Sequence, residues 1–365
     1  MKMISSKQFD VDLIINSLGR GGAERICVTL ANELNKKGYK VRIITLKQVT
    51  PNYNENVEKK VVIETLDAKK DLIGILYLKK ILAKEKFSII FSFDERITSM
   101  CNYVRIKKNK KYKVISRIIN NIDLQAKYNK KIVYKPMYAF SKKYTKYSDK
   151  IIFQCREMMT RMINYFSINT SNCKTVYIYN PLSEKFHNIQ INNNKENYYI
   201  MVGRLVEQKG YDSIIETAKV CKENNKEIHI KIFGDGEKYN ELMKKIKKYN
   251  LNIELLGNVK DIENYYKKAK ALILTSKYEG FPNVLLEANA CGCPVISFDC
   301  PTGPSEIVTK DNGILINNSV NELVKVLMNF DNNKWNYNII KKTTDKYKDN
   351  CIIEKYIKEI FDDGI

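Results

Sequence analysis

The sequence lacks the features of a membrane-spanning or disulfide-stapled protein. No stretch of its 365 residues approaches the 18 consecutive apolar residues that a membrane-spanning helix needs. Its nine cysteines include no CxxC pair, and an odd number in so long a chain is typical of a reduced protein with buried thiols. The start, MKMISSKQFDVDLIINSLG, predicts a first β-strand rather than a signal peptide. We therefore expect a cytoplasmic protein that is soluble or peripherally attached to a membrane.

Acidic residues are also scarce. Asp and Glu number 41 against 63 Lys and Arg, which gives a formal net charge of +22. This excess predicts an anionic partner, namely nucleic acid, an acidic membrane surface or a phosphate-bearing substrate. The compositional drift of an AT-rich genome is the alternative explanation, because the chain is also rich in Asn and Ile. An apolar content of 44% excludes global disorder.

The basic residues concentrate in one window, Arg105–Lys150, where fifteen Lys and Arg face two acids. Six tyrosines are interleaved with them: Tyr112, Tyr128, Tyr134, Tyr138, Tyr144 and Tyr147. Bases and tyrosines on helices are typical of a membrane-surface patch, with a solvated basic face as the alternative. Nucleic-acid binding is a third interpretation, and a basic nucleic-acid-binding protein a rival function, although no recognised nucleic-acid motif accompanies the window. We expect the anionic inner surface of the cell membrane to be a partner, and no nucleic acid.

Strand-like and helical patterns alternate along the chain, and the alternation restarts at Tyr198–Val202. Continuous apolar runs such as Ser88–Phe93 are what a parallel sheet covered on both faces requires. The sequence thus predicts an α/β fold of two doubly wound, Rossmann-like domains. The polar segment INNNKEN at 191–197 separates domains at 1–190 and 191–344, and a helix near 345–365 can pack back on the first.

Two segments of the second half carry residues suited to a nucleotide-linked sugar. In VGRLVEQKG (Val202–Gly210), glycine lets the backbone approach a phosphate, and Arg204 and Lys209 offset its charge. In YEGFPNVLLE (Tyr278–Glu287), the free N–H groups of a helix start would bind diphosphate. Carboxylates at Glu279 and Glu287 would accept hydrogen bonds from sugar hydroxyls, although Glu287 could also be an ordinary acid near a helix start.

Together these motifs resemble the retaining glycosyltransferases of family 4, which have the GT-B fold of two domains facing a central cleft. Glu279 and Glu287 match the E-x7-E signature of that family. Further matches are VGRL…QKG, IKIFGDGE at Ile230–Glu237, the NGILI turn at Asn312–Ile316, and the Gly-rich SLGRGGAER at Ser17–Arg25. The resemblance covers nearly the whole chain and is weakest in Pro51–Tyr147.

The resemblance implies a role for each matching residue. It assigns the diphosphate to Arg204 and Lys209, the donor ribose to Glu287, and the transferred sugar to Glu279. The remaining donor-binding positions are the helix-start amides of Asn283 and Val284, the loop glycines Gly21 and Gly22, and the strand-end glycines Gly203 and Gly234. At Gly234, ordinary turn chemistry is an equal alternative to contact with the nucleotide base.

One position departs from the family pattern. Many members carry a histidine near the reacting carbon, but this chain has only His187 and His229. His229 lies in a strand and His187 follows an Asn-Pro turn, so neither is expected in the site. Asp94, which directly follows the run Ser88–Phe93, is the candidate to replace that histidine near the sugar. Capping of the next helix is the alternative role for Asp94.

The resemblance implies transfer of a hexose or N-acetylhexosamine from a UDP-linked donor to a saccharide acceptor linked to polyprenyl diphosphate. The product would be a bacterial surface polysaccharide, such as O-antigen or capsule, or a lipid-linked glycan. No metal is expected, since Asp10-Val11-Asp12 begins a strand and Cys291-Gly292-Cys293 lacks a nearby histidine. A dinucleotide-dependent oxidoreductase is the rival on this architecture, but the glycines at 19, 21 and 22 have the wrong spacing.

Overall fold

The computed structural model describes residues 8–19, 21–50, 52–128 and 135–361. The chain divides into two compact units, Met1–Asn180 with Asn350–Ile365, and Pro181–Asp349. Residues 181–190, which the sequence boundary places in the first domain, thus belong to the second unit. Their contacts explain why, because Leu182 N donates to Tyr347 O at 2.7 Å and Lys341 Nζ donates to Ile189 O at 2.7 Å.

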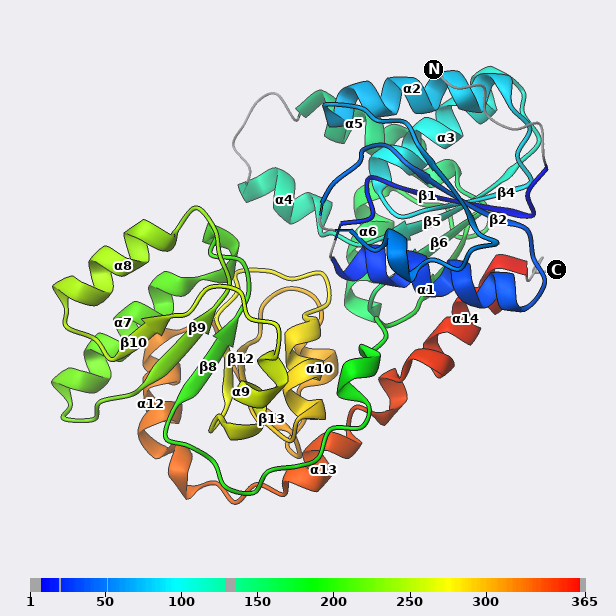
Figure 1. Cartoon of the computed structure of the whole chain (residues 1–365). Helices are drawn as coiled ribbons and strands as arrows, with labels where there is room; N and C mark the ends of the chain where they lie inside the picture. Colours follow the sequence, from blue (N-terminus) through cyan, green and yellow to red (C-terminus); the bar gives the residue numbers. More distant parts are fainter. Residues whose placement is uncertain (1–7, 20, 51, 129–134, 362–365) are drawn as a thin grey trace. The chain divides into compact units, whose positions relative to one another are not determined.

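The first unit is built on a seven-stranded parallel sheet (Figure 1) in the order β3-β2-β1-β4-β5-β6-β7. Its strands are β1 Val11–Ile15, β2 Val41–Thr45, β3 Val62–Thr65, β4 Ile89–Ser92, β5 Lys113–Ile118, β6 Lys150–Phe153 and β7 Lys174–Tyr177. Its helices are α1 Gly22–Lys36, α2 Asp71–Lys84, α3 Glu95–Lys107, α4 Ile122–Tyr128, α5 Lys135–Tyr144, α6 Arg156–Phe166 and the returning α14 Asp349–Phe361.

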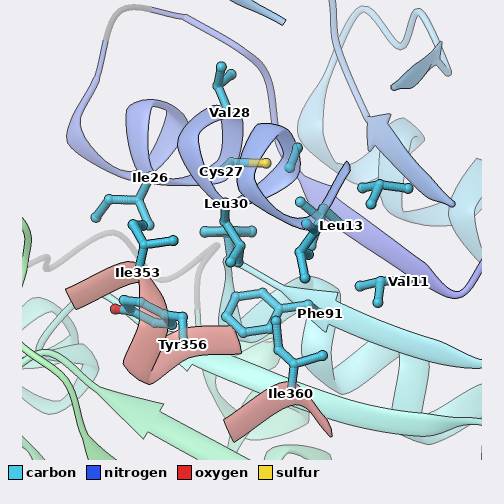
Figure 2. Close-up of a cluster of buried hydrophobic side chains, with 14 of the residues drawn as sticks. Val11, Leu13, Ile26, Cys27, Val28, Leu30, Phe91, Ile353, Tyr356 and Ile360 are labelled. Carbon is cyan, nitrogen blue, oxygen red and sulfur yellow. The ribbon is translucent and has the colours of Figure 1, made fainter. Parts of the chain in front are cut away.

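Alternate side chains of the strands pack into two helical layers, one on each face of this sheet. Val11 and Leu13 of β1 belong to one buried cluster with residues of α1 and with Ile353 of α14 (Figure 2). Ile14 faces the opposite way, into a cluster with α2 and α3. The last helix therefore completes the core of the first unit, where Tyr356 is fully buried.

Asp12 of the Asp10-Val11-Asp12 motif is part of a buried ion-pair network. Its carboxylate lies 2.5 Å from Arg42 Nε, and Arg42 Nη1 lies 3.1 Å from both Glu64 and Glu85. Burial raises the pKa of Asp12 to about 6 against the opposing pull of the guanidinium. Arg42 is itself only 1% exposed, and an unpaired guanidinium buried in this way would destabilise the fold. The three carboxylates of the network compensate its charge.

The second unit repeats the architecture with six parallel strands in the order β10-β9-β8-β11-β12-β13. Its strands are β8 Tyr199–Val202, β9 Ile230–Phe233, β10 Ile253–Leu255, β11 Leu272–Leu274, β12 Val295–Phe298 and β13 Gly313–Ile316. Its helices are α7 Tyr211–Glu223, α8 Tyr239–Lys248, α9 Ile262–Lys268, α10 Asn283–Ala290, α11 Pro304–Ile307, α12 Val320–Asn329 and α13 Tyr337–Lys342.

Each sheet has one point where the strand order reverses, between β1 and β4 in the first unit and between β8 and β11 in the second. Ligands of open parallel sheets bind at the carboxyl ends of the strands at such a point. The Gly-rich loop and Asp94 follow β1 and β4, and Gly203 and Glu279 follow β8 and β11. The topology therefore brings the motifs of each half to the edge where a ligand is expected.

Candidate functional site

A lysine–glutamate pair joins the two motif-bearing loops of the second unit. Lys209 Nζ donates to Glu279 Oε1 at 2.7 Å, and Ser276 Oγ donates to the same oxygen at 2.5 Å. The two charged side chains are 15% and 8% exposed, so the pair is largely desolvated. A lysine ammonium has three N–H donors, so Lys209 can bind an anion while it holds Glu279 in place.

Backbone contacts between the loops set the position of this pair. Thr275 Oγ1 donates to Lys209 O at 3.1 Å, and Gln208 Nε2 donates to Tyr278 O at 2.9 Å. Lys277 N donates to Gln208 O at 2.8 Å. Since these bonds connect a short 3₁₀ turn after β8 with the loop after β11, the site is held by elements that are adjacent only in the folded sheet.

Helix α10 begins directly beyond the Glu279 loop. Pro282 occupies the cap position without a side-chain cap, so the amides of Asn283 and Val284 are at the helix start as the sequence predicts. Glu287 is half-buried one turn along, and Tyr266 of α9 donates from its hydroxyl to Glu287 Oε2 at 3.4 Å. Burial holds the pKa of Tyr266 well above its usual value, which keeps its proton available to the carboxylate.

A pocket of about 300 Å³ opens at the carboxyl ends of β8, β9 and β10. Arg204 is exposed at its rim. Gly234 has a φ of +133°, and a Cβ there would lie 2.0 Å from Gly203 O, so only glycine fits this close backbone approach. The lining is Val202, Gly203, Arg204, Phe233, Gly234, Asp235, Gly257, Asn258, Val259 and Ile262.

The Gly-rich loop of the first unit leads into helix α1. Gly21 is the cap residue and Gly22 the first helical residue, whereas Arg20 lies outside the described residues. A Cβ on Gly21 would lie 2.3 Å from Glu24 Oε2, so the Glu24 carboxylate folds back toward the helix start. Burial raises the pKa of Glu24, and the nearby Arg117 guanidinium opposes that rise.

Asp94 caps helix α3 in this structure. Its carboxylate accepts from Arg96 N at 2.8 Å and from Ile97 N at 3.4 Å. Arg96 also binds it through Nη2 at 2.6 Å. The side chain is engaged by its own helix, so the geometry favours the capping alternative over a role near the sugar.

Two buried polar groups at the same edge were not singled out from the sequence. Within the described ranges, Asn16 Oδ1 after β1 and Glu95 Oε2 at the start of α3 have no hydrogen-bond partner. Burial, together with the charge of the neighbouring Asp94 carboxylate, raises the pKa of Glu95 to about 8. Unsatisfied buried groups of this kind cluster at functional sites. The only sequence signal for these two residues is their position next to the Gly-rich loop and next to Asp94.

We expect Glu95→Gln to stabilise the protein increasingly as pH rises. The unfolded carboxyl ionises near pH 4.5 whereas the folded one keeps its proton until about pH 8. The wild type therefore loses free energy of unfolding across this window, by up to about 1.4 kcal/mol per pH unit. Urea denaturation of both proteins at several values of pH measures the difference. Glu55→Gln, at an exposed position of the same unit, is the control, and a pH-independent gain from Glu95→Gln would contradict the prediction.

The two histidines contact groups outside the motif-bearing loops of the second unit. His229 Nε2 is 2.5 Å from Glu254 Oε1, and His187 Nε2 is 3.1 Å from Leu182 O. Cys291 and Cys293 are buried free thiols. Over the described part of the chain, no group of three or more His, Cys, Asp and Glu is placed to hold a metal ion.

Comparisons with known proteins agree with this division of the chain. Residues 183–347 match the family model described as glycosyl transferases group 1, and residues 20–185 match that of glycosyltransferase family 4. The amylovoran biosynthesis glycosyltransferase AmsD of Erwinia amylovora is 28% identical over 332 residues, which are 87% of this chain and 88% of that protein.

A second relative, from Campylobacter jejuni, is named GalNAc-α-(1→4)-GalNAc-α-(1→3)-diNAcBac-PP-undecaprenol α-1,4-N-acetyl-D-galactosaminyltransferase. By this name, it adds GalNAc to a saccharide that is linked to undecaprenol through a diphosphate. It is 28% identical over 323 residues, 84% of either chain. Among solved structures, Anabaena HepE in complex with UDP-glucose superposes with a TM-score of 0.74 at 15% identity. That alignment covers 97% of this chain and 99% of HepE, and it shows the same fold.

Proposed function

Because the chain belongs to the family 4 glycosyltransferases and has the GT-B fold, we propose that it transfers a hexose or N-acetylhexosamine from a UDP-linked donor with retention at the anomeric carbon. The observation that carries the proposal is the desolvated pair of Lys209 and Glu279 beside the start of α10. In this pair, Lys209 supplies a cation that can bind the diphosphate, and Glu279 supplies a carboxylate that can accept a hydrogen bond from a sugar hydroxyl.

The chemistry is loss of the nucleoside diphosphate from the anomeric carbon through an oxocarbenium-like transition state. Negative charge develops on the leaving phosphate, where Lys209, Arg204 and the α10 amides would stabilise it. Fixed charges and dipoles aimed at developing charge are the most effective form of catalysis available to such a site. In this proposal the two cations and the helix start do the work that a metal does elsewhere, so none is required.

The pocket at the ends of β8, β9 and β10 is the proposed site of the nucleotide. Its apolar side chains, from Val202, Phe233, Val259 and Ile262, suit the faces of a base. The HepE complex with UDP-glucose supports UDP as the carrier. The test is a screen of UDP- and GDP-linked sugars that scores nucleotide release and the anomeric configuration of the product. Turnover of GDP-sugars alone would refute the choice of carrier, and an inverted product would refute retention.

We propose that the acceptor is a saccharide on polyprenyl diphosphate and that the product is a surface polysaccharide, such as O-antigen or capsule, or a lipid-linked glycan. The names of AmsD and of the Campylobacter relative support this choice. The first unit would present the acceptor, with the protein held peripherally at the inner face of the cell membrane. Over the described residues, no helix has both the length and the apolar composition to cross a bilayer.

The two glutamates should separate donor binding from transfer. Glu287→Gln is expected to weaken UDP and UDP-sugar binding alike, by about tenfold, because the ribose contact is common to both. Glu279→Gln should lower transfer by about a hundredfold and UDP affinity much less, because its partner is the sugar. Isothermal titration with UDP and a single-turnover transfer assay measure the two effects. An equal loss of UDP affinity in both variants would show that the division of roles is incorrect.

A further inference from the structure

Large apolar side chains gather on one surface of the first unit. Of the eight that the described residues expose, five lie on α2, on α3 and in the 3₁₀ turn after α5. These are Leu72, Leu76, Tyr77, Ile106 and Tyr147. Helix α3 packs against both α2 and α5, and Figure 1 shows these helices on the side of the sheet opposite α1 and α14.

Helix α2 is apolar on two faces, only one of which belongs to the core. Leu78, Ile81 and Leu82 are buried in the cluster with α3, and a Cβ on Gly74 would lie 2.9 Å from Leu46 Cβ. Leu72 and Leu76 project from the other side, 72% and 47% exposed. A leucine pair one turn apart on the outer face of a helix gains nothing from folding.

Two exposed lysines accompany this apolar stripe, and the single acid of α2 is paired. Lys79 and Lys80 are exposed on the same helix. Asp71 of α2 lies 2.5 Å from Lys47 and 2.8 Å from Arg96, so its charge is compensated. The sequence of α5 contains no acid at all.

An aromatic series connects α3 and α5 beneath these cations. Tyr103 and Phe140 have ring centroids 5.7 Å apart, and Phe140 and Tyr144 are separated by 4.9 Å. The ammonium of Lys79 lies 5.3 Å from the Tyr103 ring. Lys142 and Lys143 of α5 are exposed at the other end. The surface thus combines protruding leucines with a basic, aromatic surround, a composition that fits anionic lipid headgroups over acyl chains.

We propose that the outer surface of α2, α3 and α5 docks on an anionic bilayer, with Leu72 and Leu76 inserted below the headgroups. The inference rests on the proposed membrane-linked acceptor and names the surface that meets the membrane. It also extends the docking region beyond the basic window at 105–150, of which Lys130, Lys131 and Tyr134 lie outside the described residues. The lysines draw the protein to the surface, and the leucines supply binding that salt does not screen.

The test is co-sedimentation with phosphatidylglycerol and phosphatidylcholine vesicles at low salt and at about 0.5 M salt. We expect the wild type to bind phosphatidylglycerol vesicles and to keep part of this binding at high salt. Leu72→Gln/Leu76→Gln should lose the salt-resistant part, with a partition coefficient at least about tenfold lower. Leu256→Gln/Ile339→Gln is the matched control, since these side chains are 37% and 45% exposed on the second unit. It should bind as the wild type does.

Unchanged vesicle binding by Leu72→Gln/Leu76→Gln would overturn the proposal. So would a wild-type dimer in sedimentation velocity that this variant converts to monomer without any vesicle effect, because the surface would then belong to a second copy. Hydrolysis of UDP-sugar in solution is measured on the same proteins and should be equal in all three. If the wild type does not hydrolyse UDP-sugar but the vesicle results are as expected, the proposed enzymatic function is contradicted and the docking surface is still supported.

Discussion

Replacing Lys209 with alanine is expected to lower turnover by at least about two orders of magnitude, on the order of 3 kcal/mol of transition-state stabilisation. The ammonium would contact the leaving diphosphate, whose charge grows as the glycosidic bond breaks. Its 2.7 Å bond to Glu279 also means that the variant leaves a buried carboxylate without its cation. The measurement is kcat/KM for the donor sugar in a nucleotide-release assay.

Three further variants separate the effect of losing the diphosphate contact from the effect of losing the ion pair with Glu279. Lys209→Ala/Glu279→Gln removes the stranded charge and should recover stability but not turnover. Arg204→Ala should lose turnover to a similar degree with an unchanged melting temperature, since Arg204 is exposed. Lys277→Ala, which removes an exposed partner of Glu207 nearby, should be close to wild type. Near-normal transfer by Lys209→Ala would refute the diphosphate assignment.

The sheets could be predicted because burial on both faces leaves a mark on the sequence. The run Ser88–Phe93 is apolar at every position except its two serines, and it contains β4 at Ile89–Ser92 in the middle of the first sheet. The contact of Lys209 with Glu279 could not be derived in the same way, because it requires β8 and β11 to be neighbours in space. Only the family resemblance predicted that both residues belong to one site, because the periodicity of the sequence does not indicate it.

Burial of single polar groups had no signal in the sequence. Glu95 follows Asp94 and looks like an ordinary acid in the first turn of a helix, yet it is 4% exposed. INNNKEN reads as a linker, but Lys195 within it donates to Lys267 O at 2.7 Å, and burial lowers its pKa. Conversely, the apolar pattern of α2 gives no indication that Leu72 faces outward. Each of these outcomes depends on which elements pack together, which local composition does not encode.

Gly210→Ala is expected to destabilise the second unit by about 3 kcal/mol or more. Gly210 precedes α7 with a φ of +65°, and a Cβ there would lie 2.0 Å from Thr275 O. Gly257 has a φ of +66° with nothing within 4 Å of its Cβ position, so Gly257→Ala carries the backbone strain alone, about 1 kcal/mol. The excess comes from overpacking against a backbone carbonyl that cannot move without shifting the loop after β11. Urea denaturation compares the two variants, and UDP titration of Gly210→Ala should show weaker binding because Lys209 is the preceding residue. Equal destabilisation by both substitutions would mean that the loop yields freely, and that the position of Lys209 against Glu279 is not set by this close contact.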